Sequence, residues 1–197
     1  MEIRLNKHIF KNIVTVMEKT LKEVNKVRLS NHFSKYAFTK EGVLWVTNGK
    51  IMIGIKCSNF FIKDNEEIKD NTAYEFKWFN YNKDVLSIEL TEVSGVDMKA
   101  DFNKVINFES HCSFDFNFTN LESWLAFNYR VGTFELEYLK TSFDIVKFHG
   151  TVTYSEQREM KVESDYAVFI CLGRLTNGDY IKPKSKLEIM REVSELA

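Results

Sequence analysis

The sequence contains very little cysteine, proline or glycine. Its 197 residues include three cysteines, one proline and 8 glycines. The cysteines, Cys57, Cys112 and Cys171, are odd in number and lack C-x-x-C spacing, which argues against a disulfide framework or a zinc knuckle. We interpret each thiol as a small buried hydrophobic group in a reducing compartment.

Long hydrophobic runs are also missing. No signal peptide opens the chain, because the first residues lead straight into an amphipathic pattern, and no apolar run approaches the roughly 20 residues of a membrane span. We therefore expect a cytoplasmic protein that does not contact a membrane.

Neither sign of charge is in excess. The chain has 27 Lys and Arg against 28 Asp and Glu, a net charge of −1 at pH 7. The overall electrostatic field of the protein therefore does not attract it to nucleic acid, but the net charge does not exclude a local basic surface. An apolar fraction of 44% and a charged fraction of 28% are typical of a soluble globular protein. The length allows one large domain or two small ones.

Signatures of catalysis and of metal binding are absent as well. The sequence has no G-x-x-x-x-G-K-[ST] loop, no G-x-G-x-x-G after a strand and no G-x-S-x-G elbow. Its four histidines, His8, His32, His111 and His149, lack H-x-x-x-H and H-E-x-x-H spacing. We expect no enzyme activity, no metal and no cofactor.

The strongest positive feature is a β-hairpin signal between residues 43 and 55. Two apolar runs flank Asn48-Gly49, a pair that favours a type I′ turn with positive φ at both central residues. Apolar side chains fall on both faces of these strands, which indicates a sheet covered at least partly on both sides, with helices as one cover.

An amphipathic helix is predicted ahead of the hairpin. Glu2–Leu5 alternates as a short strand, Asn6 is a suitable N-cap, and the helix should run from Lys7 to about Asn25. Its buried stripe consists of Ile9, Phe10, Ile13, Val14, Met17, Leu21 and Val24. The opposite side carries Lys7, Lys11, Lys19, Lys22 and Lys26, interrupted by Glu18 and Glu23. This lysine face fits either an ordinary solvated surface or a surface that faces phosphates.

The remaining chain alternates strands with two short helices. Strands are expected at 35–39, 60–62, 73–79, 85–93, 113–118, 132–137, 150–155, 159–163 and 166–172, with a solvated loop at 63–71. Short helices are expected at 121–127 and at 138–147, the latter with Leu139, Phe143 and Val146 on one side and Lys140 and Lys147 on another. A charged amphipathic tail helix is expected at 184–196, after a turn at Asn177-Gly178.

Two blocks of the sequence resemble the DNA sliding clamp superfamily. The first, EIRLNKHIFKNIVTVMEKT followed by KYAFTKEGVLWVTNGKIMIGI, is similar to the opening strand, pore helix and following strands of a clamp domain. The second, FELEYLKTSFDIVKFHGTVTYSEQREMKVESDYAVFICLGRL, is similar to the end of a bacterial clamp chain, where a strand enters a tyrosine-leucine helix and an apolar strand ends in an arginine-leucine pair, here Arg174-Leu175.

The resemblance implies a fold and a domain organisation. It implies an α+β, DNA-clamp-like fold of antiparallel sheets with a few short amphipathic helices packed on one face. Residues 1–110 would form an N-terminal part, 111–181 a reduced C-terminal part and 182–197 the tail helix; the alternative is one domain with an insertion at about 58–130. Bacterial clamps have three such domains and phage clamps usually two, whereas this chain supplies about one and a half.

The resemblance also implies a function and its residues. The chain would be a non-enzymatic protein of a phage or mobile element that tethers a polymerase or host replication factor on double-stranded DNA without reading its sequence. The residues that match pore helices by position are Lys7, Lys11, Lys19, Lys22, Lys26, Lys140 and Lys147. A homo-oligomer would close through an edge strand, supplied by Tyr166, Val168 and Ile170 or by Glu2–Leu5. The alternative is an interaction module or host-directed inhibitor that has lost the ring.

Overall fold

The computed structural model divides the chain into two compact units. Unit 1 comprises Met1–Asn107 with Tyr166–Val168, and unit 2 comprises Phe108–Asp165 with Phe169–Ala197. The residues that the structure describes are 1–26, 35–63, 66–96, 112–116, 120–131, 134–146, 150–154, 159–172 and 191. This division into compact units does not test the predicted domain boundaries, which stay a prediction.

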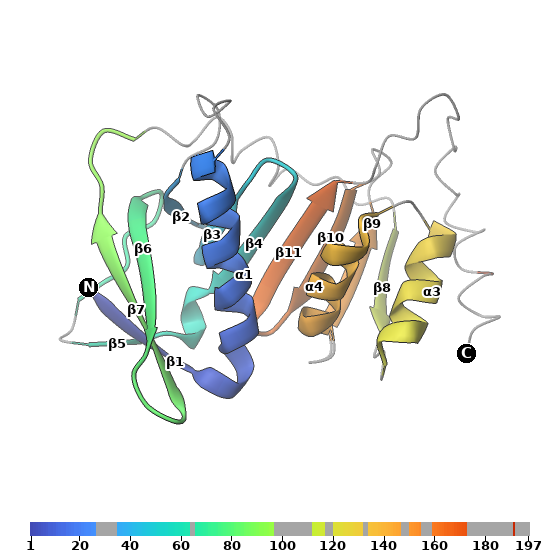
Figure 1. The fold of residues 1–197 in the computed structure, drawn as a ribbon, viewed down its shortest axis with the longest axis horizontal. Helices are drawn as coiled ribbons and strands as arrows, with labels where there is room; N and C mark the ends of the chain where they lie inside the picture. Colours follow the sequence, from blue (N-terminus) through green and yellow to red (C-terminus); the bar gives the residue numbers. More distant parts are fainter. Residues whose placement is uncertain are drawn as a thin grey trace. The chain divides into compact units, whose positions relative to one another are not determined.

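Unit 1 is built on an antiparallel sheet (Figure 1). Its strands are β1 (Glu2–Asn6), β2 (Ala37–Lys40), β3 (Val43–Thr47), β4 (Ile51–Lys56), β5 (Phe61–Ile62), β6 (Ala73–Asn80) and β7 (Val85–Glu92), with a 3-10 turn η1 (Cys57–Asn59) after β4. Within this unit the strands lie in the order β5-β1-β7-β6-β2-β3-β4. β1 therefore has a neighbour on each side, so the prediction that Glu2–Leu5 supplies a free edge is wrong.

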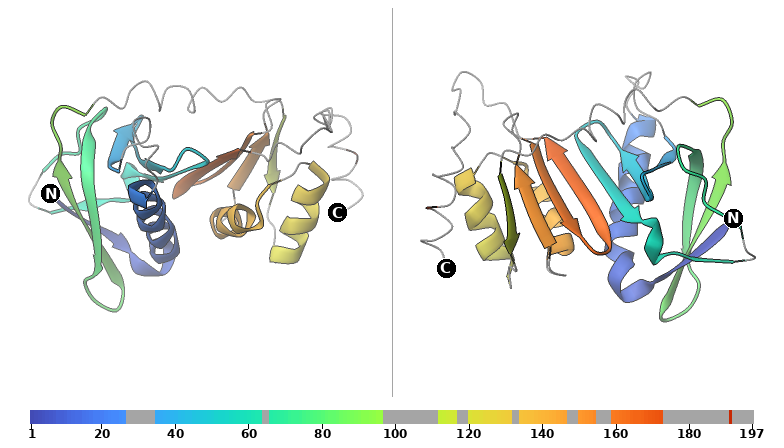
Figure 2. Two further views of the ribbon diagram at one scale, coloured as in Figure 1. Left: turned by 45° about the horizontal axis from the view of Figure 1, so that its top comes forward. Right: turned by 180° about the vertical axis from the view of Figure 1, so that it is seen from behind.

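Helix α1 (Lys7–Lys26) covers one face of this sheet. It contacts β1, β3, β4, β6 and β7, and the view from behind places the strands in front of it (Figure 2). The predicted N-cap is confirmed: the Asn6 Oδ1 accepts a hydrogen bond of 3.0 Å from the His8 N–H. Of the seven residues predicted for the buried stripe, six are at most 6% exposed and Ile9 is half-buried.

The β3–β4 hairpin forms in a different turn from the one predicted. Thr47 pairs with Met52, so Gly49 and Lys50 are the central residues of the turn. Only Gly49 has positive φ, at 85°, as in a turn with glycine at its first central position. The Asn48 Oδ1 accepts hydrogen bonds of 3.0 Å from the N–H groups of Lys50 and Ile51. This side-chain acceptor fixes Asn48 as the last residue before the turn, so the type I′ prediction is wrong.

The predicted burial of this hairpin on both faces is confirmed. Every residue of β3 is buried, as are the first five of β4. Leu44, Val46 and their partners across the strand pair belong to one face, and Trp45 with its partner Gly54 belongs to the other. The hairpin is therefore a central part of the core of unit 1.

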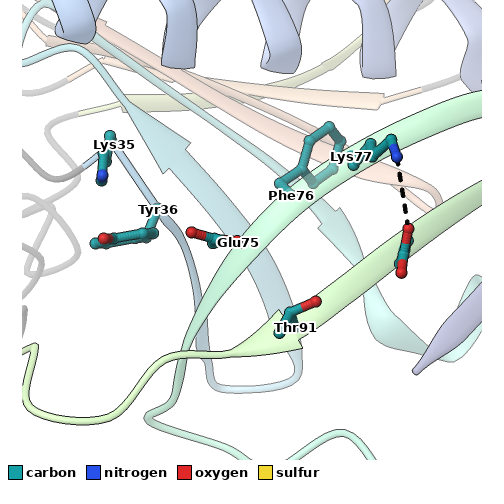
Figure 3. A pocket seen from close by; sticks show the side chains of 7 residues that line it. Lys35, Tyr36, Glu75, Phe76, Lys77 and Thr91 are labelled. Atoms are coloured by element: carbon teal, nitrogen blue, oxygen red, sulfur yellow. Dashed lines mark ion pairs between the residues drawn. The ribbon is translucent and has the colours of Figure 1, made fainter.

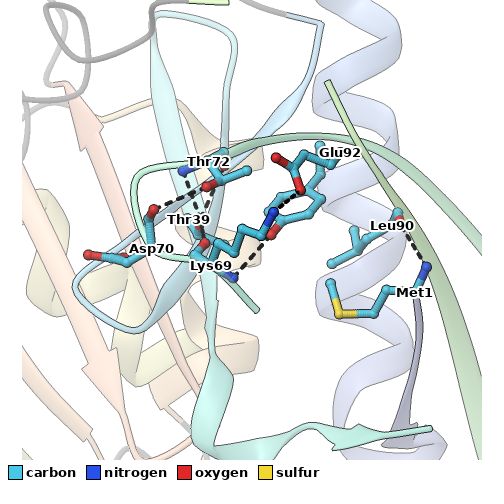
Figure 4. A network of polar contacts seen from close by, with 8 residues as sticks. Met1, Thr39, Lys69, Asp70, Thr72, Leu90 and Glu92 are labelled. Atoms are coloured by element: carbon cyan, nitrogen blue, oxygen red, sulfur yellow. Dashed lines mark hydrogen bonds and ion pairs between the residues drawn. The ribbon is translucent and has the colours of Figure 1, made fainter. Parts of the chain in front are cut away.

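The loop that precedes β6 is exposed but held by polar contacts (Figure 4). The Thr39 hydroxyl donates to the Lys69 carbonyl at 2.6 Å, and the Thr72 N–H donates to the same hydroxyl at 3.1 Å. The Lys69 Nζ also bonds the Glu92 carboxylate at 2.7 Å. The loop predicted at 63–71 is thus solvated, as expected, and anchored to β2 and β7.

Unit 2 combines strands β8 (Cys112–Phe116), β9 (Gly150–Tyr154), β10 (Glu159–Ser164) and the second half of β11 (Ala167–Leu172) with helices α3 (Leu121–Val131) and α4 (Leu136–Val146). β8 pairs with β9 and β9 with β10, both antiparallel, and β11 lies beside β10. Helix α4 packs on β9 and β10, and α3 packs on α4. Both units thus have antiparallel sheets with helices packed against them, and the predicted α+β class is confirmed.

The predicted strand at 132–137 is wrong. Among its described residues, Phe134 and Glu135 have no strand pairing, and α4 begins at Leu136. The Glu135 carbonyl accepts hydrogen bonds of 2.9 Å from the Tyr138 N–H and 3.0 Å from the Leu139 N–H, and the helix begins two residues earlier than predicted. The strand predicted at 113–118 appears as β8, with 117–119 outside the described residues. Residues 99–108, whose pattern favours neither helix nor strand, and the predicted tail helix also lie outside them, except that Arg191 is helical.

Candidate nucleic-acid interface

The lysines of α1 lie on the side of the helix opposite its buried stripe. At about 100° of rotation per residue, Lys7, Lys11 and Lys22 fall within an arc of about 60°, and Lys19 extends it to about 120°. Lys11, Lys19 and Lys22 are exposed and Lys7 is half-buried. Lys26 is the last residue of the helix. The helix rises by about 1.5 Å per residue, so the arc from Lys7 to Lys22 is a cationic strip about 22 Å long.

Lys7 is tied to the body of unit 1. Its Nζ donates a hydrogen bond of 3.1 Å to the Asn82 carbonyl, and its backbone N–H donates one of 2.8 Å to the Asp84 carbonyl. Beside it, the His8 ring lies 3.2 Å from the Asp84 carboxylate in an exposed pair. These contacts attach the first turn of α1 to the β6–β7 turn and use part of the donor capacity of Lys7.

Glu18 lies inside the lysine arc and makes two bonds. Its Oε1 pairs with the Lys22 Nζ at 2.8 Å, one helical turn further along. Its Oε2 accepts a hydrogen bond from the Trp78 indole N–H of β6. An indole N–H is a neutral donor, so this bond holds the carboxylate in place without cancelling its charge.

Glu23 lies outside the same arc, about 40° beyond Lys19 by rotation. Its Oε2 accepts a hydrogen bond of 2.8 Å from the Asn48 amide, which belongs to the β3–β4 turn. Both carboxylates of α1 are therefore held by neutral donors from the sheet. Neither Trp78 nor Asn48 was predicted as part of this surface, because each lies at least 25 residues from its helix partner.

In unit 2, Lys140 is an exposed residue of α4, and Lys147 lies outside the described residues. The buried residues described on α4 are Leu139, Ser142 and Ile145. Of the predicted Leu139, Phe143 and Val146, Leu139 is buried, and the Val146 side chain lies outside the described part of the chain. The Trp124 indole N–H of α3 donates to the Leu139 carbonyl at 2.9 Å and to the Ser142 hydroxyl at 3.0 Å, in a site where Trp124 and Ser142 are fully buried. Phe143 is half-buried.

The residues predicted for a subunit edge are already used within the chain. In unit 1, the Lys56 N–H donates to the Tyr166 carbonyl at 3.0 Å, and the Tyr166 ring packs edge-on against Phe10 at 5.8 Å. Val168 and Ile170 are each 3% exposed. Val168 and Ile170 are thus buried and Tyr166 is half-buried, and the use of these three residues as a subunit edge stays a prediction. Among the described strands, the outermost is β5 in unit 1 and β8 in unit 2.

The structure also has a shallow pocket of about 380 Å³ on unit 1 (Figure 3). Its lining includes Lys35, Glu75, Lys77 and Glu89. The Lys77 Nζ and the Glu89 carboxylate are exposed and 4.0 Å apart. The two lysines and two glutamates of this lining cancel in charge. Neighbouring residues of β6 point to opposite faces of the sheet, and Trp78 reaches α1. Lys77, and with it the pocket, therefore lies on the face opposite to α1.

The described residues contain no cluster of three or more His, Cys, Asp or Glu side chains with the geometry to hold a metal ion. None of the described helices is long and apolar enough to cross a membrane. Cys171 is fully buried, as predicted, and burial raises the pKa of its thiol. Cys57 is only half-buried; burial, with a smaller effect of the nearby Asp70 carboxylate, raises its pKa to about 11.

Comparison with known proteins gives similar structures but no similar sequences. No protein-family model matches the chain, and no curated protein matches it. The DNA polymerase III β subunit of Thermotoga maritima is similar with a TM-score of 0.49 and 12% identity, over 91% of this chain and 65% of that one. The Helicobacter pylori β clamp bound to a DNA ligase peptide is similar with a TM-score of 0.47 and 12% identity, over 94% and 70% of the two chains. The sliding clamp of Pseudomonas aeruginosa is similar with a TM-score of 0.46 and 7% identity, over 93% and 68%. The chain thus spans about 65% of the length of the Thermotoga protein.

Proposed function

We propose that this chain is a non-enzymatic, clamp-like protein that rests on double-stranded DNA and tethers partner proteins to it. The observation that carries the proposal is the lysine arc of α1: a 20-residue helix with one side buried in a sheet and lysines on the opposite side. The sequence resemblance to clamps supports the same assignment, since the matching block contains this helix. An origin in a phage or mobile element, and a polymerase or host replication factor as the partner, belong to this proposal.

The charge pattern suits contacts with phosphates and no reading of bases. Lysine is a flexible point charge, and phosphate contacts position a protein on the duplex without specifying its sequence. Lys11, Lys19 and Lys22 belong to unit 1, and Lys140 supplies an exposed cation in unit 2. With a net charge of −1, the protein is expected to bind weakly, and each lysine–phosphate contact should add about 0.9 to the slope of log K against log salt.

Binding to a 30-base-pair duplex at several salt concentrations tests the proposal. The variant Lys11→Gln/Lys19→Gln should bind more weakly, and its slope of log K against log salt should be shallower by about 1.8, which is two contacts of about 0.9 each. The matched control is Lys63→Gln/Lys77→Gln, which removes two charges from exposed lysines, with Lys77 on the opposite sheet face. Equal losses in both variants, or no salt-dependent binding by the wild type, would overturn the proposal.

A homo-oligomer remains part of the proposal, with a different edge from the one first predicted. β8 pairs with β9 along five residues and is the outermost described strand of unit 2, whereas β5 has only two residues. A longer outermost strand is the better template for a second chain, so among the described strands β8 is the proposed contact. Sedimentation of the wild type against a variant with proline at Ser113, an exposed residue of β8, tests it.

The second candidate function is a clamp-fold interaction module or host-directed inhibitor that no longer encircles DNA. The contacts of Lys7 with Asn82 and of Lys22 with Glu18 favour it, because they reduce the charge available for phosphates. A monomer that does not bind duplex DNA even at low salt would favour this candidate over the first.

A further inference from the structure

We infer that Glu18 is a built-in attenuator of duplex DNA binding: it neutralises Lys22 and places a fixed negative charge within the lysine arc. This inference rests on the proposed function and concerns the strength of contact at the same surface. Its basis is the pair of bonds from Glu18 to Lys22 and to Trp78.

The position of Glu18 on the helix is the first part of the argument. By rotation it falls between Lys7 and Lys11, and one turn separates it from Lys22. A phosphate approaching Lys11 or Lys22 therefore also approaches the Glu18 carboxylate. Like charges about 6–10 Å apart in water repel by about 0.4–0.7 kcal/mol each, so one carboxylate acts on several phosphates at once.

The hydrogen bond from the Trp78 indole to Glu18 is the second part of the argument. A glutamate on an exposed helix face ordinarily changes rotamer to avoid an approaching anion. Here the Trp78 indole of β6, itself half-buried, holds Oε2, while Oε1 faces Lys22. The Glu18 side chain is 33% exposed and that of Lys22 is 66% exposed, so the pair lies at the rim where a ligand would arrive. Moving Glu18 away would cost its bond to the indole.

Glu23 is the internal comparison. It has the same charge, lies five residues further along α1 and is also held by a neutral donor, the Asn48 amide. By rotation it stands about 40° outside the lysine arc. Neutralising Glu23 should therefore change DNA affinity less than neutralising Glu18.

The test is Glu18→Gln against Glu23→Gln, with a 30-base-pair duplex as the probe. Glutamine keeps a carbonyl oxygen for the Trp78 or Asn48 donor, so both variants should fold, which thermal melting would check. Glu18→Gln should bind about tenfold more tightly at 0.1 M salt, with a slope of log K against log salt steeper by about 0.9, because Lys22 is released to contact one further phosphate. Glu23→Gln should gain less than threefold and keep the wild-type slope.

The outcomes separate the attenuator from the proposed function. Equal gains in both variants, or a Glu18→Gln slope unchanged from wild type, overturn the attenuator while DNA binding stands. No binding by wild type or by either variant overturns both. A Lys22→Gln/Glu18→Gln double variant supplies the final check: it should lose the extra slope of Glu18→Gln, and a double variant that keeps this extra slope contradicts the role of Lys22.

Discussion

Replacing Gly54 with alanine should destabilise unit 1, although the same change in most strands is stabilising. Gly54 of β4 pairs directly with Trp45 of β3. A Cβ at position 54 would lie 2.5 Å from the Val43 Cγ1 and 2.8 Å from the Trp45 Cε3, against the 3.5–4.0 Å of an ordinary carbon contact. The side chains must then move by roughly 1 Å in a region where Trp45 is 5% exposed.

The expected cost follows from this overlap. Overpacking of a dense core costs about 1–3 kcal/mol, and the lower chain entropy of alanine returns about 0.5–1 kcal/mol, so Gly54→Ala should lose about 1–2 kcal/mol. In urea, with an m-value of about 2 kcal/mol/M, the midpoint of unfolding should fall by about 0.5–1 M. The cost should shrink in a Val43→Ala background, which removes the nearest methyl group. An unchanged or higher midpoint for Gly54→Ala, or an equal cost in both backgrounds, would refute the reasoning.

Two further predictions concern ionisable groups of unit 1. Because burial raises the Cys57 pKa from 9.0 to about 11, alkylation of this thiol by iodoacetamide at pH 8 should be about 100-fold slower than in the urea-unfolded chain, and equal rates would contradict it. The hydrogen bond from Arg4 lowers the pKa of Glu2 below its ordinary 4.5, so the stabilisation is present above that value and is lost as the pH falls through the folded-state pKa. The difference in melting temperature between wild type and Glu2→Gln should therefore be larger at pH 7 than at pH 3, and a constant difference would argue against this pair.

The elements predicted correctly are those whose pattern is local. Helix α1 carries its apolar residues at helical spacing over five turns, and β6 and β7 form within a residue or two of the predicted bounds. In each of these segments the spacing of the apolar residues indicates both the type of secondary structure and the face that is buried, so no information from the rest of the chain is needed. The fold class followed from the order of such segments.

The errors arose where a distant side chain decides between two local possibilities. Residues 134–137 alternate in polarity and fit a strand, but the hydrogen bonds that Trp124 makes to Leu139 and Ser142 favour helix α4 there. The β3–β4 turn changed because the Asn48 side chain takes the place of a backbone acceptor.

The candidate site was predictable as a helix face, but its charge balance was not. The lysine spacing is local, whereas the bonds of Glu18 to Trp78 and of Glu23 to Asn48 join residues 60 and 25 positions apart. These two bonds, together with the buried stripe, fix the rotation of α1 about its own axis and hence the direction of its lysines. Because both donors are neutral, glutamine at position 18 or 23 keeps the bonds that orient the helix and removes only the charge. A Glu-to-Gln change at either position therefore alters the electrostatic field of the lysine arc and leaves the direction of its lysines unchanged. A small number of such variants is enough to separate the two effects by experiment.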